Sequence, residues 1–110
     1  MLDLLQKSLD YIEGNLKSEI CATELAGLIG YSLYHYYHLF QKHLGIPVMQ
    51  YITRRKLLHA VYEIANGGLM VDVALSYGFA TYAGFSKAFT REFGCSPSKY
   101  TGEESQEAPE

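Results

Sequence analysis

The chain has 110 residues, the length of one domain or of two very small ones, and a formal charge of −3. That total excludes a strongly basic protein, but residues 33–100 carry seven basic and three acidic side chains, whereas residues 1–32 and 101–110 are acidic. Two cysteines are too few for a disulfide framework, and no segment resembles a signal peptide or a membrane span, so we expect a cytoplasmic protein without a membrane partner.

Apolar side chains at helical spacing predict two helices ahead of the first glycine turn. The first covers about residues 2–14, where leucine and isoleucine recur every three or four positions. The second is short, from about 22 to 29, and Gly30 ends it because glycine accepts the positive φ that the turn demands. We expect its inner side to carry Leu25, Ala26 and Leu28.

The third predicted helix, over residues 33–44, has an unusual outer side. Ser32 is its candidate N-cap, and Gly45 ends it. Its inner side is expected to contain Leu33, Tyr36, Leu39, Phe40 and Leu44. Its outer side presents aromatic and amide groups in place of charges, namely Tyr34, Tyr37, His38 and Gln41. Such side chains suit recognition of a partner better than contact with water alone.

A fourth helix follows Pro47, a residue that suits a helix start. No breaker interrupts it from about residue 48 to residue 65, which gives a length of roughly 27 Å at 1.5 Å per residue. The earlier pattern then returns: a short helix from Met70, a turn at Gly78, and a helix over residues 82–93. Thr81 is the candidate N-cap of this last helix, and Gly94 ends it; its inner side is expected to contain Phe85, Ala88, Phe89 and Phe93.

The two halves of the chain are a repeat. An offset of 48 matches Ala26, Gly30 and Tyr31 with Ala74, Gly78 and Phe79, and an offset of 49 matches Tyr36, Phe40, Lys42, Gly45 and Tyr51 with Phe85, Phe89, Arg91, Gly94 and Tyr100. Each half has the order of a helix-turn-helix motif. We therefore predict an all-α domain over residues 1–100 with about seven helices. Two helix-turn-helix subdomains, at about 22–45 and 70–94, are joined by the linker helix at about 48–65.

The length of the linker helix is near the ~34 Å between successive major-groove faces of DNA. The second helices of the two subdomains are therefore expected to enter adjacent major-groove segments on one side of a duplex. After Tyr100 the composition is Gly, Glu, Ser, Gln and Pro with one apolar residue, Ala108, which predicts an acidic disordered tail or linker over residues 101–110.

The second half also carries a family signature. The segments 78–89, GFATYAGFSKAF, and 93–100, FGCSPSKY, resemble the signature of the AraC/XylS transcriptional regulators. In the first half, Gly30-Tyr31-Ser32, Phe40, Gly45 and Tyr51-Ile52 are similar to the first helix-turn-helix of the same family. The resemblance covers about residues 3–100. It implies an all-helical domain that binds double-stranded promoter DNA through two helix-turn-helix units and activates transcription by contacting RNA polymerase.

The resemblance also implies roles for single residues. Base contacts would come from Leu33, Tyr34, Tyr37, His38 and Gln41 in the first unit, and from Tyr82, Ala83, Ser86 and Lys87 in the second. Contacts to the DNA backbone would come from Ser32, Lys42, Thr81, Thr90 and Arg91, and from amides at helix N-termini. His38 stands where the family commonly has arginine, and Pro47-Val48 stands where it usually has Ser-Pro.

Arg54, Arg55 and Lys56 form a basic run near the start of the linker helix. One interpretation is a clamp on the DNA phosphates. The other is solubility alone, or the pairing of Arg55 with an acidic side chain inside the domain. The sequence gives both interpretations about equal weight.

Other classes of site find little support in the sequence. His35, His38 and His43 lie close together, but no cysteine or carboxylate completes a tetrahedral zinc site on that face, so we expect no metal. No catalytic constellation or phosphate loop is present, so we expect no enzymatic activity and no cofactor. The alternative function from another class is a helical protein–protein interaction module that uses the tyrosine-rich face.

Members of the family usually carry a second domain that binds a small molecule or mediates dimerisation. Nothing in these 110 residues could form one. The acidic tail has the composition of a linker to a following domain, so the sequence slightly favours a fragment whose ligand-binding domain lies on the C-terminal side.

Overall fold

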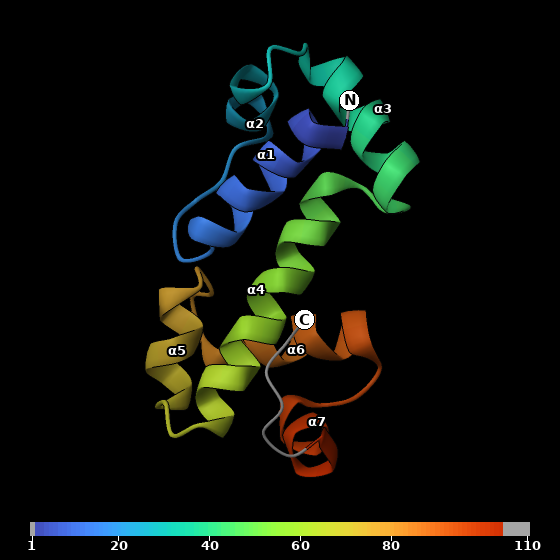
Figure 1. Ribbon diagram of the computed structural model, residues 1–110. Coiled ribbons are helices and arrows are strands. Elements are labelled where there is room, and N and C mark those ends of the chain that lie inside the picture. The colour runs from blue at the N-terminus through green and yellow to red at the C-terminus, as the bar shows by residue number, and fades with distance from the viewer. Residues whose placement is uncertain (1, 105–110) are drawn as a thin grey trace. The chain divides into compact units, whose positions relative to one another are not determined.

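The computed structural model describes residues 2–104, and within that range it contains seven helices and no strand (Figure 1). The helices are α1 (Leu2–Gly14), α2 (Ala22–Leu28), α3 (Leu33–Leu44), α4 (Val48–Ala65), α5 (Met70–Ser76), α6 (Tyr82–Phe93) and α7 (Pro97–Glu104). The expected all-α fold is confirmed. The bounds of α3, α4 and α6 are those that the sequence predicts. None of the described helices is long and apolar enough to cross a membrane.

The chain divides into two compact units, Met1–Thr53 and Arg54–Glu110. The first contains α1, α2, α3 and the start of α4, and the second contains the rest of α4 with α5, α6 and α7. Figure 1 shows α4 as one uninterrupted helix that belongs to both units. Each unit therefore contains one helix-turn-helix pair, α2 with α3 or α5 with α6.

The core of the first unit forms around α1 and the inner side of α3. Tyr36 and Phe40 are fully buried there, with side chains from the neighbouring helices, including Leu5, Ile12, Leu16, Leu25, Val48 and Ile52. The Tyr36 hydroxyl donates to Ser8 Oγ at 3.2 Å, and Ser8 Oγ donates to the Leu5 carbonyl at 2.8 Å. Burial raises the pKa of Tyr36, and the bond to Ser8 opposes that rise. The bond gives the one buried phenol of α3 a polar partner on α1.

The second unit has a core of phenylalanine rings and small residues. Phe85 and Phe89 are fully buried, and the same unit also buries Leu57, Ala60, Val61, Val73, Ala74, Tyr77 and Ala88. The Tyr77 hydroxyl donates to the Glu63 carboxylate and so links α5 to α4. The pKa of Tyr77 is raised, mainly by burial and to a smaller extent by the bond to Glu63.

The sequence repeat has a structural counterpart in each unit. In the first, the Ala26 carbonyl accepts from the Tyr31 amide at 2.9 Å; in the second, the Ala74 carbonyl accepts from the Phe79 amide at 3.0 Å. A T-shaped aromatic pair also recurs. The Phe40 and Tyr51 rings lie 5.4 Å apart, and the Phe89 and Tyr100 rings lie 5.3 Å apart. Both units therefore form the helix-turn-helix and attach the next helix in the same way.

Local predictions at the end of α2 and in the C-terminal segment differ from the structure. Leu28 was expected inside the first unit but is 39% exposed, because α2 ends at Leu28 and the following change of backbone direction buries Ile29 instead. The sequence predicts an acidic disordered tail or linker over residues 101–110; α7 extends into this range as far as Glu104, and the rest stays a prediction. Ser96 Oγ accepts from the Lys99 amide at 3.2 Å, and Pro97 is the first helical residue, so α7 has a stable start. Residues 105–110 lie outside the described residues.

Candidate nucleic-acid interface

Helix α3 presents the first candidate surface. Ser32 Oγ accepts from the His35 amide at 3.2 Å, and Gly45 ends the helix with a left-handed φ of 83°. Between these caps, Tyr36, Leu39 and Phe40 are buried, whereas Leu33 and Leu44 are half-buried. The other predicted base-contacting residues of α3 are exposed; we call them the α3 outer face, namely Tyr34, Tyr37, His38 and Gln41.

Ring contacts order part of the α3 outer face. Tyr34 is 66% exposed, yet its ring lies 4.3 Å from the His38 ring and 5.5 Å from the His35 ring, centroid to centroid. His35 Nδ1 lies 2.9 Å from the N-cap hydroxyl of Ser32. These contacts hold the Tyr34 and His38 rings against each other on the exposed side of α3.

Helix α6 presents the corresponding surface of the second unit. Thr81 Oγ1 accepts from the Gly84 amide at 3.0 Å, and Gly94 ends the helix with a φ of 79°. Of the predicted base-contacting residues, Ala83 and Lys87 are exposed. Tyr82 and Ser86 are half-buried; the Tyr82 ring packs 5.6 Å from the Phe85 ring. Lys87 is therefore the longest predicted base-contacting side chain that this surface exposes.

The predicted phosphate-contacting residues of the two helices are exposed, but their hydroxyls have partners. Ser32 and Thr81 cap their own helices, and Thr90 Oγ1 donates to the Ser86 carbonyl at 2.9 Å. Lys42 and Arg91 lie in the last turns of α3 and α6, at matching positions of the repeat. These two cations are the strongest candidates for phosphate contacts from the helices.

The basic run on α4 is half-buried, and its first residue is held inside the second unit. Arg54 Nε lies 3.7 Å from Glu92 Oε1, and the Arg54 guanidinium lies 5.3 Å from the centre of the Phe93 ring. The sequence predicts Phe93 on the buried inner side of α6, but its side chain is only half-buried. An Arg55 terminal nitrogen lies 3.1 Å from His59 Nε2. Arg54 therefore has an acidic partner within the second unit. The pairing of Arg55 with an acidic side chain stays a prediction.

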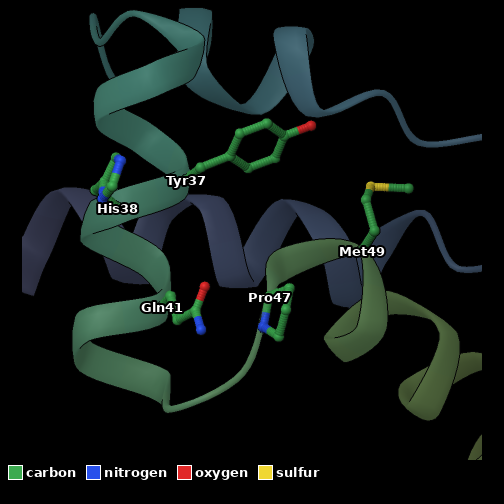
Figure 2. Close-up of a pocket in the computed structure, with 5 residues that line it drawn as sticks. All are labelled: Tyr37, His38, Gln41, Pro47 and Met49. Atoms are coloured by element: carbon green, nitrogen blue, oxygen red, sulfur yellow. The ribbon is translucent and has the colours of Figure 1, made fainter.

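A pocket that the sequence did not predict adjoins the α3 outer face. It has a volume of about 380 Å³, is mostly apolar, and is lined by Tyr37, His38, Gln41, Pro47 and Met49. Figure 2 shows Tyr37 and Gln41 extending from α3 toward the start of α4, where Pro47 and Met49 lie. Met49 is 44% exposed. In the sequence, the only signal of this pocket is a methionine two residues after the proline that starts a helix.

The segment that carries this surface contains no acidic side chain. From Leu25 to Tyr62 the sequence contains no aspartate or glutamate, whereas it contains Lys42, the basic run on α4 and all four histidines of the chain. No carboxylate of that stretch therefore repels an anionic partner. Among residues 2–104 there is no group of three side chains placed to hold a metal, and the metal-free site stays a prediction.

Comparisons with known proteins agree on one family. Residues 25–103 match the model of a helix-turn-helix domain. The chain is 36% identical over 98 residues to the HTH-type transcriptional activator AarP of Providencia stuartii, covering 88% of this chain and 73% of AarP. It spans only 41%, 33% and 37% of three further curated relatives.

Solved structures give the same result. A probable AraC family transcriptional regulator from Rhodopseudomonas palustris superposes with a TM-score of 0.77 at 26% identity, over 92% of this chain and 96% of the other. The DNA-binding domain of the global transcriptional factor AdpA, solved in complex with a target DNA, superposes with a TM-score of 0.73 at 20% identity, over 90% of each chain.

Proposed function

The chain belongs to the AraC family of helix-turn-helix transcription regulators, and we propose that it binds promoter DNA in a sequence-specific manner through the α3 and α6 surfaces. The observation that carries the proposal is the repeated helix. Each unit presents a twelve-residue helix with a side-chain N-cap, a left-handed glycine at its end and a buried aromatic inner side. The alternative of a protein-interaction module is not favoured, because the named relatives are transcription regulators.

In the proposed complex, the α3 outer face contacts base edges in one segment of the major groove. Gln41 carries an amide that can donate to and accept from adenine, and the tyrosine rings can pack against thymine methyl groups. His38 offers one or two hydrogen bonds. In the second segment, Lys87 can donate to the O6 and N7 acceptors of guanine. The small side chain of Ala83 lets α6 approach the bases closely. Leu33, Tyr82 and Ser86 are half-buried and contribute at the edges of these contacts.

Phosphate contacts fix the position of both units in this proposal. Lys42 and Arg91 are exposed in the last turns of their helices, and Ser32, Thr81 and Thr90 stand beside them as polar contacts. The amides at the starts of α3 and α6 attract phosphate in the same way. Arg55 and Lys56 remain candidates for this role, whereas the contacts of Arg54 favour a role inside the second unit.

We extend the proposal to activation of transcription with RNA polymerase as the protein partner, by analogy with AarP, which is named a transcriptional activator. The cytoplasm is the location proposed with this role. We also propose that α3 and α6 enter successive major-groove segments, because the chain repeats the helix-turn-helix unit. A ligand-binding companion domain stays a prediction, and the length of the full open reading frame tests it.

Selection of bound sequences from a random duplex pool, followed by affinity measurements on the selected duplex, tests the proposal. The double variant His38→Ala with Lys87→Ala should lose specific binding and keep its circular dichroism spectrum, because both side chains are exposed. Lys7→Ala, an exposed change on α1, is the control and should bind as the wild type does. Unchanged affinity of the double variant would contradict the assignment.

The interaction-module alternative has its own test. At about 50 mM salt, even non-specific attraction to salmon-sperm DNA should shift the protein's fluorescence, and high salt should abolish the shift. Absence of binding at low salt would favour the alternative.

A further inference from the structure

The pocket beside α3 exists because the chain places apolar groups where a DNA-binding surface is usually polar. Its walls are the ring of Tyr37, the ring of Pro47 and the side chain of Met49, and Gln41 supplies an amide at the edge (Figure 2). Pro47 and Met49 belong to the start of α4, where the Pro47 carbonyl accepts from the Tyr51 amide at 3.0 Å. These two residues carry no role in the predicted interface, although they are continuous with it.

The second unit provides an internal comparison. The pocket has five lining residues, and the offset of 49 relates them to the second unit. His38 corresponds to Lys87, and the other four, Tyr37, Gln41, Pro47 and Met49, correspond to Ser86, Thr90, Ser96 and Ser98. Thus a ring, an amide, a proline and a methionine in the first unit correspond to four hydroxyl side chains in the second. The fold does not require apolar groups at these positions, because α6 and α7 form without them.

We propose that this pocket binds the methyl groups of thymine, and that Met49 and Pro47 thereby determine a preference for A·T pairs in the half-site contacted by the first unit. The inference rests on the proposed DNA-binding function. In the major groove, an A·T pair displays a methyl group on thymine beside the N7 acceptor and N6 donor of adenine. An apolar recess bordered by the Gln41 amide is complementary to that combination.

Charge and size agree with this occupant. The stretch from Leu25 to Tyr62 contains no carboxylate, so nothing in it repels the phosphates that flank a base pair. A volume of about 380 Å³ exceeds that of one methyl group, so consecutive thymines would fill the pocket better than a single one. The second unit, with hydroxyl groups at the same positions, should show no such dependence on the methyl group.

Deoxyuridine scanning tests the inference. In a duplex selected from a random pool by the wild-type protein, each thymine is replaced in turn by deoxyuridine, which removes only the methyl group. At one or two positions in one half-site, the wild-type affinity should fall about fourfold, the equivalent of one buried methyl group at about 0.8 kcal/mol. Met49→Ala should reduce this factor below about 1.5, and Met49→Leu should retain it.

Met70→Ala is the matched control. Met70 is 49% exposed at the start of α5 and lies outside the pocket, so the variant should keep the fourfold effect. If deoxyuridine is neutral at every position, or if Met49→Ala shows the full effect, the inference is overturned while the proposed function stands. If the wild-type protein selects no sequence from the pool, the proposed function itself fails.

Discussion

The sequence leaves two interpretations of Arg54 open, whereas the structure favours a contact inside the second unit over a phosphate contact. Arg54→Met tests this choice. Methionine keeps an apolar side chain beside Phe93 but removes the charge that Glu92 and the ring attract. The Arg54 side chain is 38% exposed, so solvent screens the ion pair, and we assign it about 0.5 kcal/mol. The cation–π contact adds about 0.5–1 kcal/mol at an exposed site.

The expected cost is therefore about 1–1.5 kcal/mol of unfolding free energy, measured by urea denaturation. The slope of log affinity against log salt on the selected duplex should stay unchanged, because Arg54 neutralises no phosphate in this account. Lys42→Met is the counterpart. Its unfolding free energy should stay within about 0.5 kcal/mol of the wild type, and its slope of log affinity against log salt should be smaller by about 0.9. The reasoning is refuted if Arg54→Met lowers the slope by that amount and leaves stability unchanged.

Three further predictions concern stability. Gly45→Ala and Gly94→Ala should each cost about 1–2 kcal/mol in urea denaturation, because both glycines have a left-handed φ. Apart from its chain neighbours the added carbon meets nothing within 4 Å, so the cost is backbone strain alone, and equal stability would contradict this. Thr81→Ala should cost about 1 kcal/mol through loss of the N-cap, and Thr81→Ser should restore most of it. Burial and Glu63 raise the pKa of Tyr77, so the stability from its neutral phenol is present below about pH 10 and lost above it. The thermal midpoint of Tyr77→Phe should therefore fall less between pH 8 and pH 11 than that of the wild type; an equal fall would exclude the effect.

The sequence predicted most helix bounds because the chain marks them chemically. Ser32 and Gly45 delimit α3, and Thr81 and Gly94 delimit α6, so local hydrogen bonding alone identifies the ends. The exposed side of α3 also followed from helical periodicity. Leu28 shows the limit of periodicity: in a seven-residue helix, one backbone turn at the end decides whether Leu28 or Ile29 is buried.

The parts of the site that the sequence missed depend on contacts between elements. The pocket requires α3 and the start of α4 to lie side by side, and no spacing rule places Met49 next to Tyr37. The partners of Arg54 were missed for the same reason, because Glu92 and Phe93 lie about 40 residues further along the chain. Pairings between distant segments follow from the packed core of the unit, which the sequence pattern does not specify.

The central claim is that two helices of this chain contact base edges in the major groove. The most direct test replaces each purine of the selected duplex in turn by its 7-deaza analogue, which removes the N7 acceptor that only the major groove exposes. Losses of affinity should fall into two clusters about 10 base pairs apart, one for each helix. A single cluster, or affinity that no 7-deaza substitution changes, would contradict the claim.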